Sequence, residues 1–382
     1  MHAVKFSNDL KAYPMLDLSA QFQQLKGDLM PAIESVLENA SFVNGSEVGE
    51  FAKELSIYTG IKHVIPCANG TDALQLSFMS LELPEGSEVI CPGFTYIAVA
   101  EVCKLLKLVP VFAEVDAETF NLNPYEIEKH ITPKTKAIVP VHLFGQCCDM
   151  ESIMAIAEKH NLYVIEDNAQ SIGAECFYSD GSIKPAGGIG HIGTSSFFPS
   201  KNLGAYGDGG AVFTNDDVLA KKIKTLANHG QEIKYQHKLV GINSRLDTLQ
   251  AAILLVKLKH LNHFTKLRQE TAAAYDNAFK DFEQVKIPKR FNKSSHVFHQ
   301  YTLQILQGDR TNIVSSLKAA GISSMVYYPI PVHKQEAFRN DQSLPICENL
   351  CKTVISIPIG TEMSKESIEY IAYTFKQIIK QK

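Results

Sequence analysis

Short apolar runs alternate with helical patterns between residues 63 and 215. Several runs predict strands, because they are short, bounded by turn residues and rich in β-branched side chains; they are HVIPC (63–67), SEVICPG (87–93), VPVFAEV (109–115), AIVPVHLFG (137–145), LYVIED (162–167), TSSFF (194–198) and GAVFTN (210–215). Between them, residues 71–81, 96–107 and 149–160 repeat apolar side chains near i, i+3, i+4 and i+7, which predicts helices. This alternation predicts stacked βα units and a largely parallel sheet that is buried on both faces.

Two further helices are expected after the last of these strands. Residues 215–230 predict a helix with an asparagine or aspartate cap that stops at Gly230. A second helix is expected to start near Ser244, to carry an apolar stripe and to continue toward Phe279. Its length makes it a bridge between two domains.

The pattern changes again beyond about residue 285. A basic stretch is followed by a strand-like segment (300–306), a helical segment (312–321) and a loop (327–335). This order favours a small α+β unit packed beside the large one. We therefore expect an α/β fold with a large domain over residues 1–260, N-terminal segment included, and a small C-terminal domain over residues 261–382.

Composition narrows the class of protein. The chain of 382 residues is 45% hydrophobic and 20% charged, which is ordinary for a globular protein. Its net charge is -4 and it has no basic block, so nucleic acid is not an expected partner. The N-terminus lacks the apolar core of a signal peptide and no apolar run is long enough to span a membrane, so a cytoplasmic protein is expected. The eight cysteines show neither a disulfide framework nor zinc-ligand spacing, which predicts buried thiols and no metal.

The first candidate for chemistry is ANGTDALQ at residues 68–75. A predicted strand ends here, Gly70 turns the chain, and a helix begins at Thr71. Exposed amides at a helix N-terminus attract an anion, and the Thr71 hydroxyl adds a donor. A plain capped turn is the alternative reading of this stretch.

The second candidate closes the strand LYVIED. Glu166 and Asp167 end an apolar run, and Gln170 follows three residues later. Ligands of parallel α/β sheets bind beyond the carboxyl ends of the strands. Two acids are costly there unless they are paired, which favours a functional Asp167 over a simple helix cap.

The third candidate is Lys201, set among glycines, aromatics and hydroxyl residues in TSSFFPSKNLGAYGDGG. A lysine shielded from water loses its proton and attacks a carbonyl to form a Schiff base. An exposed loop lysine, or a pair with Asp208, is the alternative. A cradle for an anion, a carboxylate for a pyridinium proton and an amine for an aldehyde are together the demands of pyridoxal 5'-phosphate.

Three longer stretches carry a family resemblance. IEDNAQSIGA, SSFFPSKNLGAYGDGGAVFTND and INSRLDTLQAAIL resemble the signatures of the DegT/DnrJ/EryC1/StrS sugar aminotransferases. The resemblance begins near residue 14 and extends toward the C-terminus, so it covers nearly the whole chain. It implies the aspartate aminotransferase fold (fold type I), a PLP-dependent transferase with a mostly parallel sheet in its large domain and a smaller α+β C-terminal domain.

The resemblance also implies roles for individual residues. They are Lys201 as the Schiff-base lysine and proton shuttle, Asp167 as partner of the pyridine nitrogen, Gln170 beside the ring hydroxyl, Gly70, Thr71 and Ser196 as phosphate ligands, and Tyr96 stacked on the ring. Ordinary helix packing is the alternative for Tyr96. Asn243 matches an amide that reaches the phosphate of the neighbouring subunit, which implies a homodimer with shared active sites.

The implied activity is transfer of an amino group, from glutamate, to a keto group on a nucleotide sugar. Several stretches, GFTYIAVAEV and HLFGQCCDM among them, are especially similar to family members that aminate C3 of UDP-2-acetamido-2-deoxy-3-oxo-D-glucuronate for O-antigen synthesis. In those members the arginine matching Arg245 contacts the sugar carboxylate, as a guanidinium fork can; pairing with Asp247 or a place in a dimer interface is the alternative.

The loop beside the substrate departs from those members. Tyr327 stands where they carry histidine, before the tyrosine that matches Tyr328, which leaves a different keto sugar, such as a 4-keto-6-deoxy sugar, as an alternative substrate. His229 and His333 are further candidate substrate contacts or structural histidines. A noncatalytic regulatory protein of the same fold is a second reading, and dinucleotide binding through GAYGDGG is a weaker third.

Overall fold

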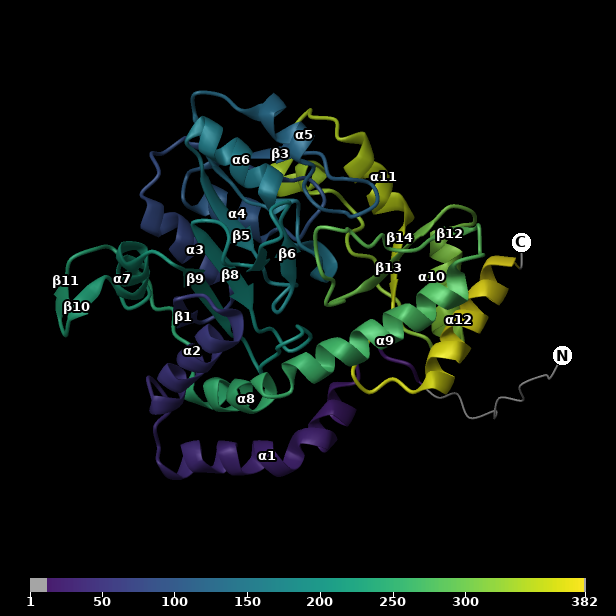
Figure 1. The fold of residues 1–382 in the computed structure, drawn as a ribbon, viewed down its shortest axis with the longest axis horizontal. Helices are drawn as coiled ribbons and strands as arrows, with labels where there is room; N and C mark the ends of the chain where they lie inside the picture. The colour runs from purple at the N-terminus through teal and green to yellow at the C-terminus, as the bar shows by residue number, and fades with distance from the viewer. Residues whose placement is uncertain (1–11, 381–382) are drawn as a thin grey trace.

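The centre of the computed structural model is a seven-stranded sheet (Figure 1). Its strands are β1 (His63–Cys67), β2 (Glu88–Pro92), β3 (Val109–Ala113), β4 (Thr135–Ile138), β5 (Tyr163–Asp167), β8 (Ile192–Ser196) and β9 (Gly210–Thr214). They follow the order β1–β9–β8–β5–β4–β2–β3. Only β9 runs antiparallel to its neighbours in this sheet, so the predicted mostly parallel sheet is confirmed. The structure describes residues 12–380, and the first part of the expected N-terminal segment, residues 1–11, lies outside them.

Helices cover both faces of this sheet. They are α2 (Ser46–Thr59), α3 (Gly70–Leu81), α4 (Ala98–Leu105), α6 (Met150–His160), α7 (Asp217–Leu226) and α8 (Thr248–Leu258). Val89 shares a core with α3, α4 and α7, whereas its neighbour Ile90 shares a core with α6. Likewise Val212 faces the first of these cores and Phe213 faces a core with α2 and α8. Since successive side chains of a strand point to opposite faces, this two-sided burial explains the continuously apolar runs.

Shorter elements surround the large sheet. They are α1 (Leu18–Glu38), α5 (Pro124–Ile127), the 3-10 helices η1 (Glu128–His130) and η2 (Leu143–Gly145), the hairpin of β6 (Glu175–Phe177) and β7 (Ile183–Pro185), and the hairpin of β10 (Gln231–Ile233) and β11 (Gln236–His237). α1 packs against α8. The β10–β11 hairpin lies at the edge of the molecule, at the far left of Figure 1.

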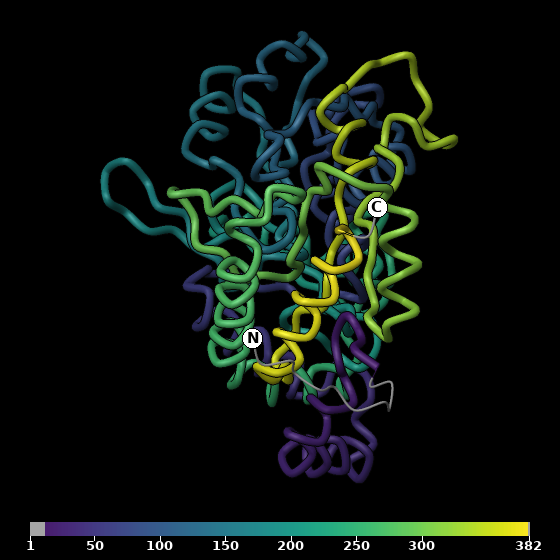
Figure 2. Tube along the Cα trace, turned by 90° about the vertical axis from the view of Figure 1, so that its right-hand side faces the viewer, coloured from purple at the N-terminus to yellow at the C-terminus, as the bar shows by residue number. Residues whose placement is uncertain are grey.

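The C-terminal region builds a second core around a small antiparallel sheet. Its elements are α9 (Leu261–Phe279), β12 (Val285–Lys286), β13 (Tyr301–Ile305), α10 (Arg310–Ala319), η3 (Val332–Lys334), η4 (Glu336–Phe338), α11 (Pro345–Thr353), β14 (Val354–Ile357) and α12 (Lys365–Lys380). The sheet order is β12–β13–β14, and α12 packs against α9 and α10 (Figure 2). Tyr275, Leu303 and Phe375 share this core.

Helix ends differ from those expected. The long helix is interrupted at residues 259–260, so α8 and α9 are separate, and α8 starts at Thr248 rather than near Ser244. Ser244 instead accepts a hydrogen bond from the Ala68 amide at 3.1 Å, which holds it in a loop. α7 is capped by Asp216, as expected, but ends at Leu226.

The expected boundary at residue 260 coincides with this interruption and stays a prediction. α11 returns to the core of the large sheet through Cys347 and Leu350. All eight cysteines are free and buried. Within residues 12–380, no helix is long and apolar enough to cross a bilayer, and no cluster of potential metal ligands occurs.

Candidate active site

A cavity of about 480 Å³ lies beyond the carboxyl ends of β1, β5 and β8, a volume in the range of small-molecule sites. Segments of the C-terminal region face those strand ends across it. Most of the predicted site residues line the cavity: Gly70, Thr71, Tyr96, Asp167, Gln170, Ser196, Lys201, Tyr327 and Tyr328. Elements far apart in the sequence therefore bring these side chains together.

The N-terminus of α3 forms one end of the cavity. Asn69 caps the helix by accepting a hydrogen bond from the Asp72 amide at 2.8 Å, while the amides of Gly70 and Thr71 lie in the first turn, where no helical carbonyl is available to them. A Cβ on Gly70 would lie 2.7 Å from Ser196 Cβ, so only glycine lets β8 approach this closely. The turn is thus a capped helix start and also an open set of amide donors beside a serine, as an anion requires.

Asp167 lies at the last position of β5 and borders the cavity. Its Oδ1 accepts a hydrogen bond from the Ala169 amide at 3.0 Å. Burial raises the pKa of Asp167, and the Ala169 amide and the positive charge of Lys201 oppose that rise. A cationic ring nitrogen in the cavity would add a further favourable partner for the ionised carboxylate.

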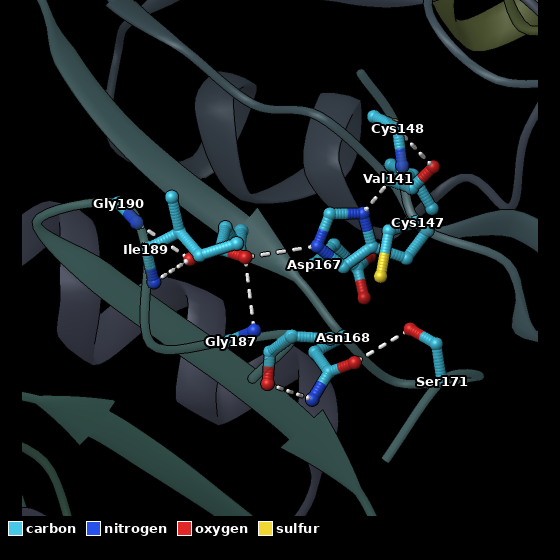
Figure 3. A network of polar contacts seen from close by, with 12 residues as sticks. Val141, Cys147, Cys148, Asp167, Asn168, Ser171, Gly187, Ile189 and Gly190 are labelled. Carbon is cyan, nitrogen blue, oxygen red and sulfur yellow. Dashed lines mark hydrogen bonds and ion pairs between the residues drawn. The ribbon is translucent and has the colours of Figure 1, made fainter. Parts of the chain in front are cut away.

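Glu166, the residue before Asp167, is fully buried, does not line the cavity, and belongs to a hydrogen-bond network whose partners Gly187, Ile189 and Gly190 are labelled in Figure 3. Its carboxylate accepts four hydrogen bonds, from the amides of Gly187 (2.9 Å), Ile189 (2.7 Å) and Gly190 (2.6 Å) and from His142 Nε2 (2.9 Å). The two acids at this strand end therefore differ in role, because Glu166 is satisfied by protein groups and Asp167 faces the cavity.

The geometry around His142 identifies its tautomer. Its Nδ1 accepts a hydrogen bond from the Cys148 amide at 3.2 Å, so the proton lies on Nε2 and is donated to Glu166. His142 is fully buried, as is Glu166. The His142 ring bridges the segment after β4 to the end of β5.

Lys201 reaches the cavity from the loop that follows β8. Its backbone amide donates to the Phe198 carbonyl at 2.8 Å, which fixes the turn. Burial lowers the pKa of Lys201 to about 8, and the negative charge of Asp167 opposes that change. Lys201 is not a solvated loop lysine, and no ion pair joins it to Asp208 among the described residues, although Asp208 lines the same cavity.

Aromatic and amide side chains line the opposite wall. Gln170 Oε1 accepts from the Phe144 amide at 2.8 Å, and its Nε2 donates to the Tyr328 hydroxyl at 3.2 Å. Tyr96 is 58% exposed, and its ring lies 6.2 Å from that of Tyr328. Since α4 begins only at Ala98, Tyr96 is outside the helix, which disfavours simple helix packing.

The remaining predicted residues lie outside this cavity. Asn243 and Arg245 line a neighbouring hollow of about 470 Å³, which shares Asn69 and Asp208 with the cavity. Arg245 makes no ion pair with Asp247 or another residue of 12–380. These two side chains face a surface next to the site and do not enter the site of their own chain.

The two histidines proposed as substrate contacts, His229 and His333, also lie outside the cavity. His229 is exposed, and its carbonyl accepts from His237 Nδ1 at 2.9 Å within the segment that leads into the β10–β11 hairpin. His333 is buried against Phe112, with its Nε2 3.2 Å from Glu348 Oε1. The structural interpretation of His333 therefore fits its surroundings better than substrate contact does.

Sequence reasoning missed several residues of the wall. Thr95, Phe144, His299 and Gln300 line the cavity without having been singled out. His299 and Gln300 stand immediately before β13, where the only local signal was an apolar strand. Nothing in that pattern indicates that this strand start faces the ends of β5 and β8.

The cavity fits pyridoxal phosphate on three observations. The first-turn amides of α3 and the Ser196 hydroxyl come together at one end of the cavity, and a Cβ on Gly70 would collide with Ser196 there. The buried Asp167 carboxylate suits a protonated ring nitrogen, and the shielded Lys201 amine suits an aldehyde.

Replacing Glu166 tests the network in Figure 3. Glu166→Gln turns one acceptor oxygen into an amide donor that faces backbone N–H groups, so the free energy of unfolding should fall by about 2–4 kcal/mol. Urea denaturation measures this change. Glu158→Gln, at an exposed position of α6, is the control and should stay within about 0.5 kcal/mol. Equal midpoints for Glu166→Gln and the wild type would contradict a structural role for the network.

The pKa of Lys201 predicts a pH dependence for coenzyme uptake. The neutral amine is the nucleophile, so coenzyme-free protein should react with pyridoxal phosphate at a rate that rises with pH and levels above about 8. Asp167→Asn removes the charge that raises this pKa and should move the midpoint to lower pH. Stopped-flow absorbance follows the reaction. A rate that keeps rising toward about pH 10, as for an exposed lysine, is the result that this account excludes.

Known proteins resemble this chain over most of its length. A pleiotropic regulatory protein of Geobacillus stearothermophilus is 43% identical over 364 residues, which cover 94% of this chain and 96% of that protein. The UDP-2-acetamido-2-deoxy-3-oxo-D-glucuronate aminotransferase of Pseudomonas aeruginosa is 45% identical over 359 residues, covering 93% of this chain and 97% of that enzyme.

Solved structures also resemble this chain over most of its length. A DegT DnrJ EryC1 StrS aminotransferase from Brucella abortus superimposes with a TM-score of 0.90 at 38% identity, over 96% of this chain and 99% of that one. NtdA from Bacillus subtilis, solved with bound cofactor PMP, has a TM-score of 0.89 at 29% identity, over 99% of this chain and 87% of that one. These matches confirm the predicted fold class and the pyridoxal phosphate cofactor. Residues 23–376 match the family model, and the chain therefore belongs to the DegT/DnrJ/EryC1/StrS aminotransferase family, as a PLP-dependent nucleotide-sugar aminotransferase.

Proposed function

We propose that this enzyme transfers an amino group from glutamate to C3 of a UDP-2-acetamido-2-deoxy-3-oxo-glucuronate type sugar, in the synthesis of O-antigen or a related polysaccharide precursor. The observation that carries the proposal is the 45% identity to the Pseudomonas aeruginosa enzyme of that name over 93% of the chain. Glutamate leaves as 2-oxoglutarate, and the keto carbon of the sugar receives its nitrogen.

Different residues of the cavity are assigned different parts of the amino transfer. Bound pyridoxal phosphate supplies an electron sink through which an amino group moves between two carbon skeletons. Asp167 keeps the ring nitrogen protonated by its charge, and Lys201, with a pKa of about 8, accepts and returns a proton near neutral pH. The amides of Gly70 and Thr71 hold the phosphate together with Ser196.

A homodimer is part of the proposal. Asn243 and Arg245 lie beside the cavity of their own chain and not in it, so they are available to the site of a second copy. Large apolar side chains are exposed nearby and in the β10–β11 hairpin, as an interface requires; they include Phe42 (48% exposed), Val43 (53%), Ile233 (60%) and Tyr235 (80%).

Arg245 is the proposed contact for the sugar carboxylate. Lys201 is the one cationic side chain among the described residues that line the cavity, and chemistry engages its amine. A carboxylate on the sugar therefore needs a cation from outside, and an unpaired guanidinium in the adjoining hollow suits it bidentately. Tyr327 lines the cavity at the position where the similar C3 aminotransferases carry histidine, so a 4-keto-6-deoxy sugar is the alternative substrate.

We propose that the enzyme works in the cytoplasm. Eight free and buried cysteines agree with a reducing compartment. The regulatory name of the Geobacillus relative raises a noncatalytic role as a second candidate. The presence of both Lys201 and Asp167 in one cavity favours catalysis instead.

Turnover with defined sugars tests the substrate. Purified protein loaded with pyridoxal phosphate should convert glutamate and the UDP-linked 3-oxo uronate into 2-oxoglutarate and an amino sugar, measured by mass spectrometry. Turnover of a dTDP-4-keto-6-deoxy hexose without turnover of the 3-oxo uronate would reject the C3 assignment. No turnover with either sugar would favour the regulatory candidate.

Mixed dimers test whether Arg245 acts in the second subunit. Lys201→Ala and Arg245→Ala should each be nearly inactive on the 3-oxo uronate, because each removes one required group from every site. Refolding the two variants together should restore up to about a quarter of wild-type activity, since half of the dimers then contain one complete site. Activity that stays at the level of the single variants would show that Arg245 serves its own chain.

A further inference from the structure

The segment of residues 297–300 forms part of the cavity wall and is held from three sides. Its Val297 amide donates to the Gly145 carbonyl at 2.8 Å, and the Gln300 amide donates to the Phe144 carbonyl at 3.3 Å. Asn202, next to the catalytic lysine candidate, donates to the Val297 carbonyl at 2.9 Å. The segment is therefore fixed to the large sheet before any ligand binds, which is the preorganisation that a recognition surface needs.

A third support comes from α9. The fully buried guanidinium of Arg268 donates to the Phe298 carbonyl at 3.1 Å and to the His299 carbonyl at 3.4 Å. The wall is thus tied to both the large sheet and the C-terminal region. The backbone of the segment is therefore held in place beside the loop that carries Lys201.

Two side chains of this wall have unsatisfied polar atoms. His299 and Gln300 both line the cavity, and both are more than nine-tenths buried. His299 Nδ1 and Gln300 Oε1 have no hydrogen-bond partner among the described residues, and the one polar contact between the two side chains is a 3.5 Å approach of their Nε2 atoms. These two atoms are closed off even from water, so the polar group of the pair that is left for a ligand is the Gln300 Nε2 donor, whose 3.5 Å contact with His299 is at the limit of a hydrogen bond.

The wall is also uncharged. Burial lowers the pKa of His299 well below its ordinary value, and the positive charges of Lys201 and Arg268 lower it further. Its imidazole is therefore neutral near pH 7. A neutral imidazole and an amide suit hydroxyl or amide groups of a ligand and have no charge with which to attract a carboxylate.

We propose that Gln300, supported by His299, is a specificity-determining residue that hydrogen-bonds to hydroxyl or acetamido groups of the keto sugar. This inference rests on the proposed function and extends it to a neutral subsite, distinct from the carboxylate contact assigned to Arg245. The weakly engaged Gln300 Nε2 donor is the group whose hydrogen bond the sugar completes. The smaller amino donor does not need them.

The closing experiment compares the two half-reactions in Gln300→Leu. For the UDP-linked 3-oxo uronate, kcat/KM should fall about 10-fold to 100-fold, mainly through KM, because hydrogen bonds to the sugar are lost. Release of 2-oxoglutarate from glutamate in a single turnover should change less than about threefold. Equal losses in both half-reactions would overturn the proposal, because a general distortion of the site gives that pattern.

A matched control lies four residues further along the chain, on β13. Gln304 is buried on β13 and outside the cavity, and its Nε2 donates to the Ala117 carbonyl at 2.7 Å. Gln304→Leu should leave the sugar KM unchanged. A KM for Gln300→Leu that equals those of Gln304→Leu and the wild type would also overturn the proposal.

A second variant and a second sugar substrate complete the experiment. If Gln300→Leu does not fold, Gln300→Asn retains an amide and withdraws it by one methylene, and the sugar KM should still rise while the glutamate step does not. If the wild type aminates only a dTDP-4-keto-6-deoxy hexose, the substrate assignment has failed, and the same variants measured on that hexose test the neutral wall by itself.

Discussion

The buried carboxylate of Glu166 is the constraint on which the site depends. Glu166 is the next-to-last residue of β5, and its four hydrogen bonds join that strand end to the loop of residues 187–190 and to His142. A carboxyl group at this depth is tolerated because the protein supplies hydrogen-bond partners for both of its oxygens. Since Asp167 is the next residue, the same bonds set where its carboxylate enters the cavity.

A balance of burial and charge then prepares the two reactive groups. Burial favours the neutral form of each, so it raises the pKa of Asp167 and lowers that of Lys201 to about 8. Their mutual attraction opposes both shifts without cancelling them. The lysine thus keeps a usable fraction of free amine near neutral pH, while a cationic ligand would complete the stabilisation of the carboxylate. The same burial and the same pair of charges therefore set both the pKa of Lys201 and the attraction of Asp167 for a cationic ligand.

Local sequence patterns predicted the site residues that lie at the end of a strand or shortly after it. Strand ends could be read from apolar runs, so Gly70, Asp167 and Lys201 were found as residues that follow strands, and the family resemblance linked them to one cofactor. His299 and Gln300 could not be found in this way, because their role depends on the packing of the second core against the large sheet.

Other features had no local signal. The interruption between α8 and α9 leaves the apolar stripe unbroken in the sequence. The hydrogen bonds of Glu166 come from loop amides 21 to 24 residues further along the chain. The loop pattern left His333 as either a substrate contact or a structural histidine, and only tertiary packing shows that it is buried against Phe112.

The central claim is that Lys201 carries the coenzyme, and borohydride reduction followed by peptide mass mapping tests it most directly. A second lysine, Lys257, makes the test selective, because burial lowers its pKa to about 8 as well but it lies outside the cavity. The account predicts that reduction fixes the coenzyme on the peptide that contains Lys201 and leaves the Lys257 peptide unmodified. Coenzyme on Lys257 or another lysine, or a protein that retains none after reduction, would contradict it.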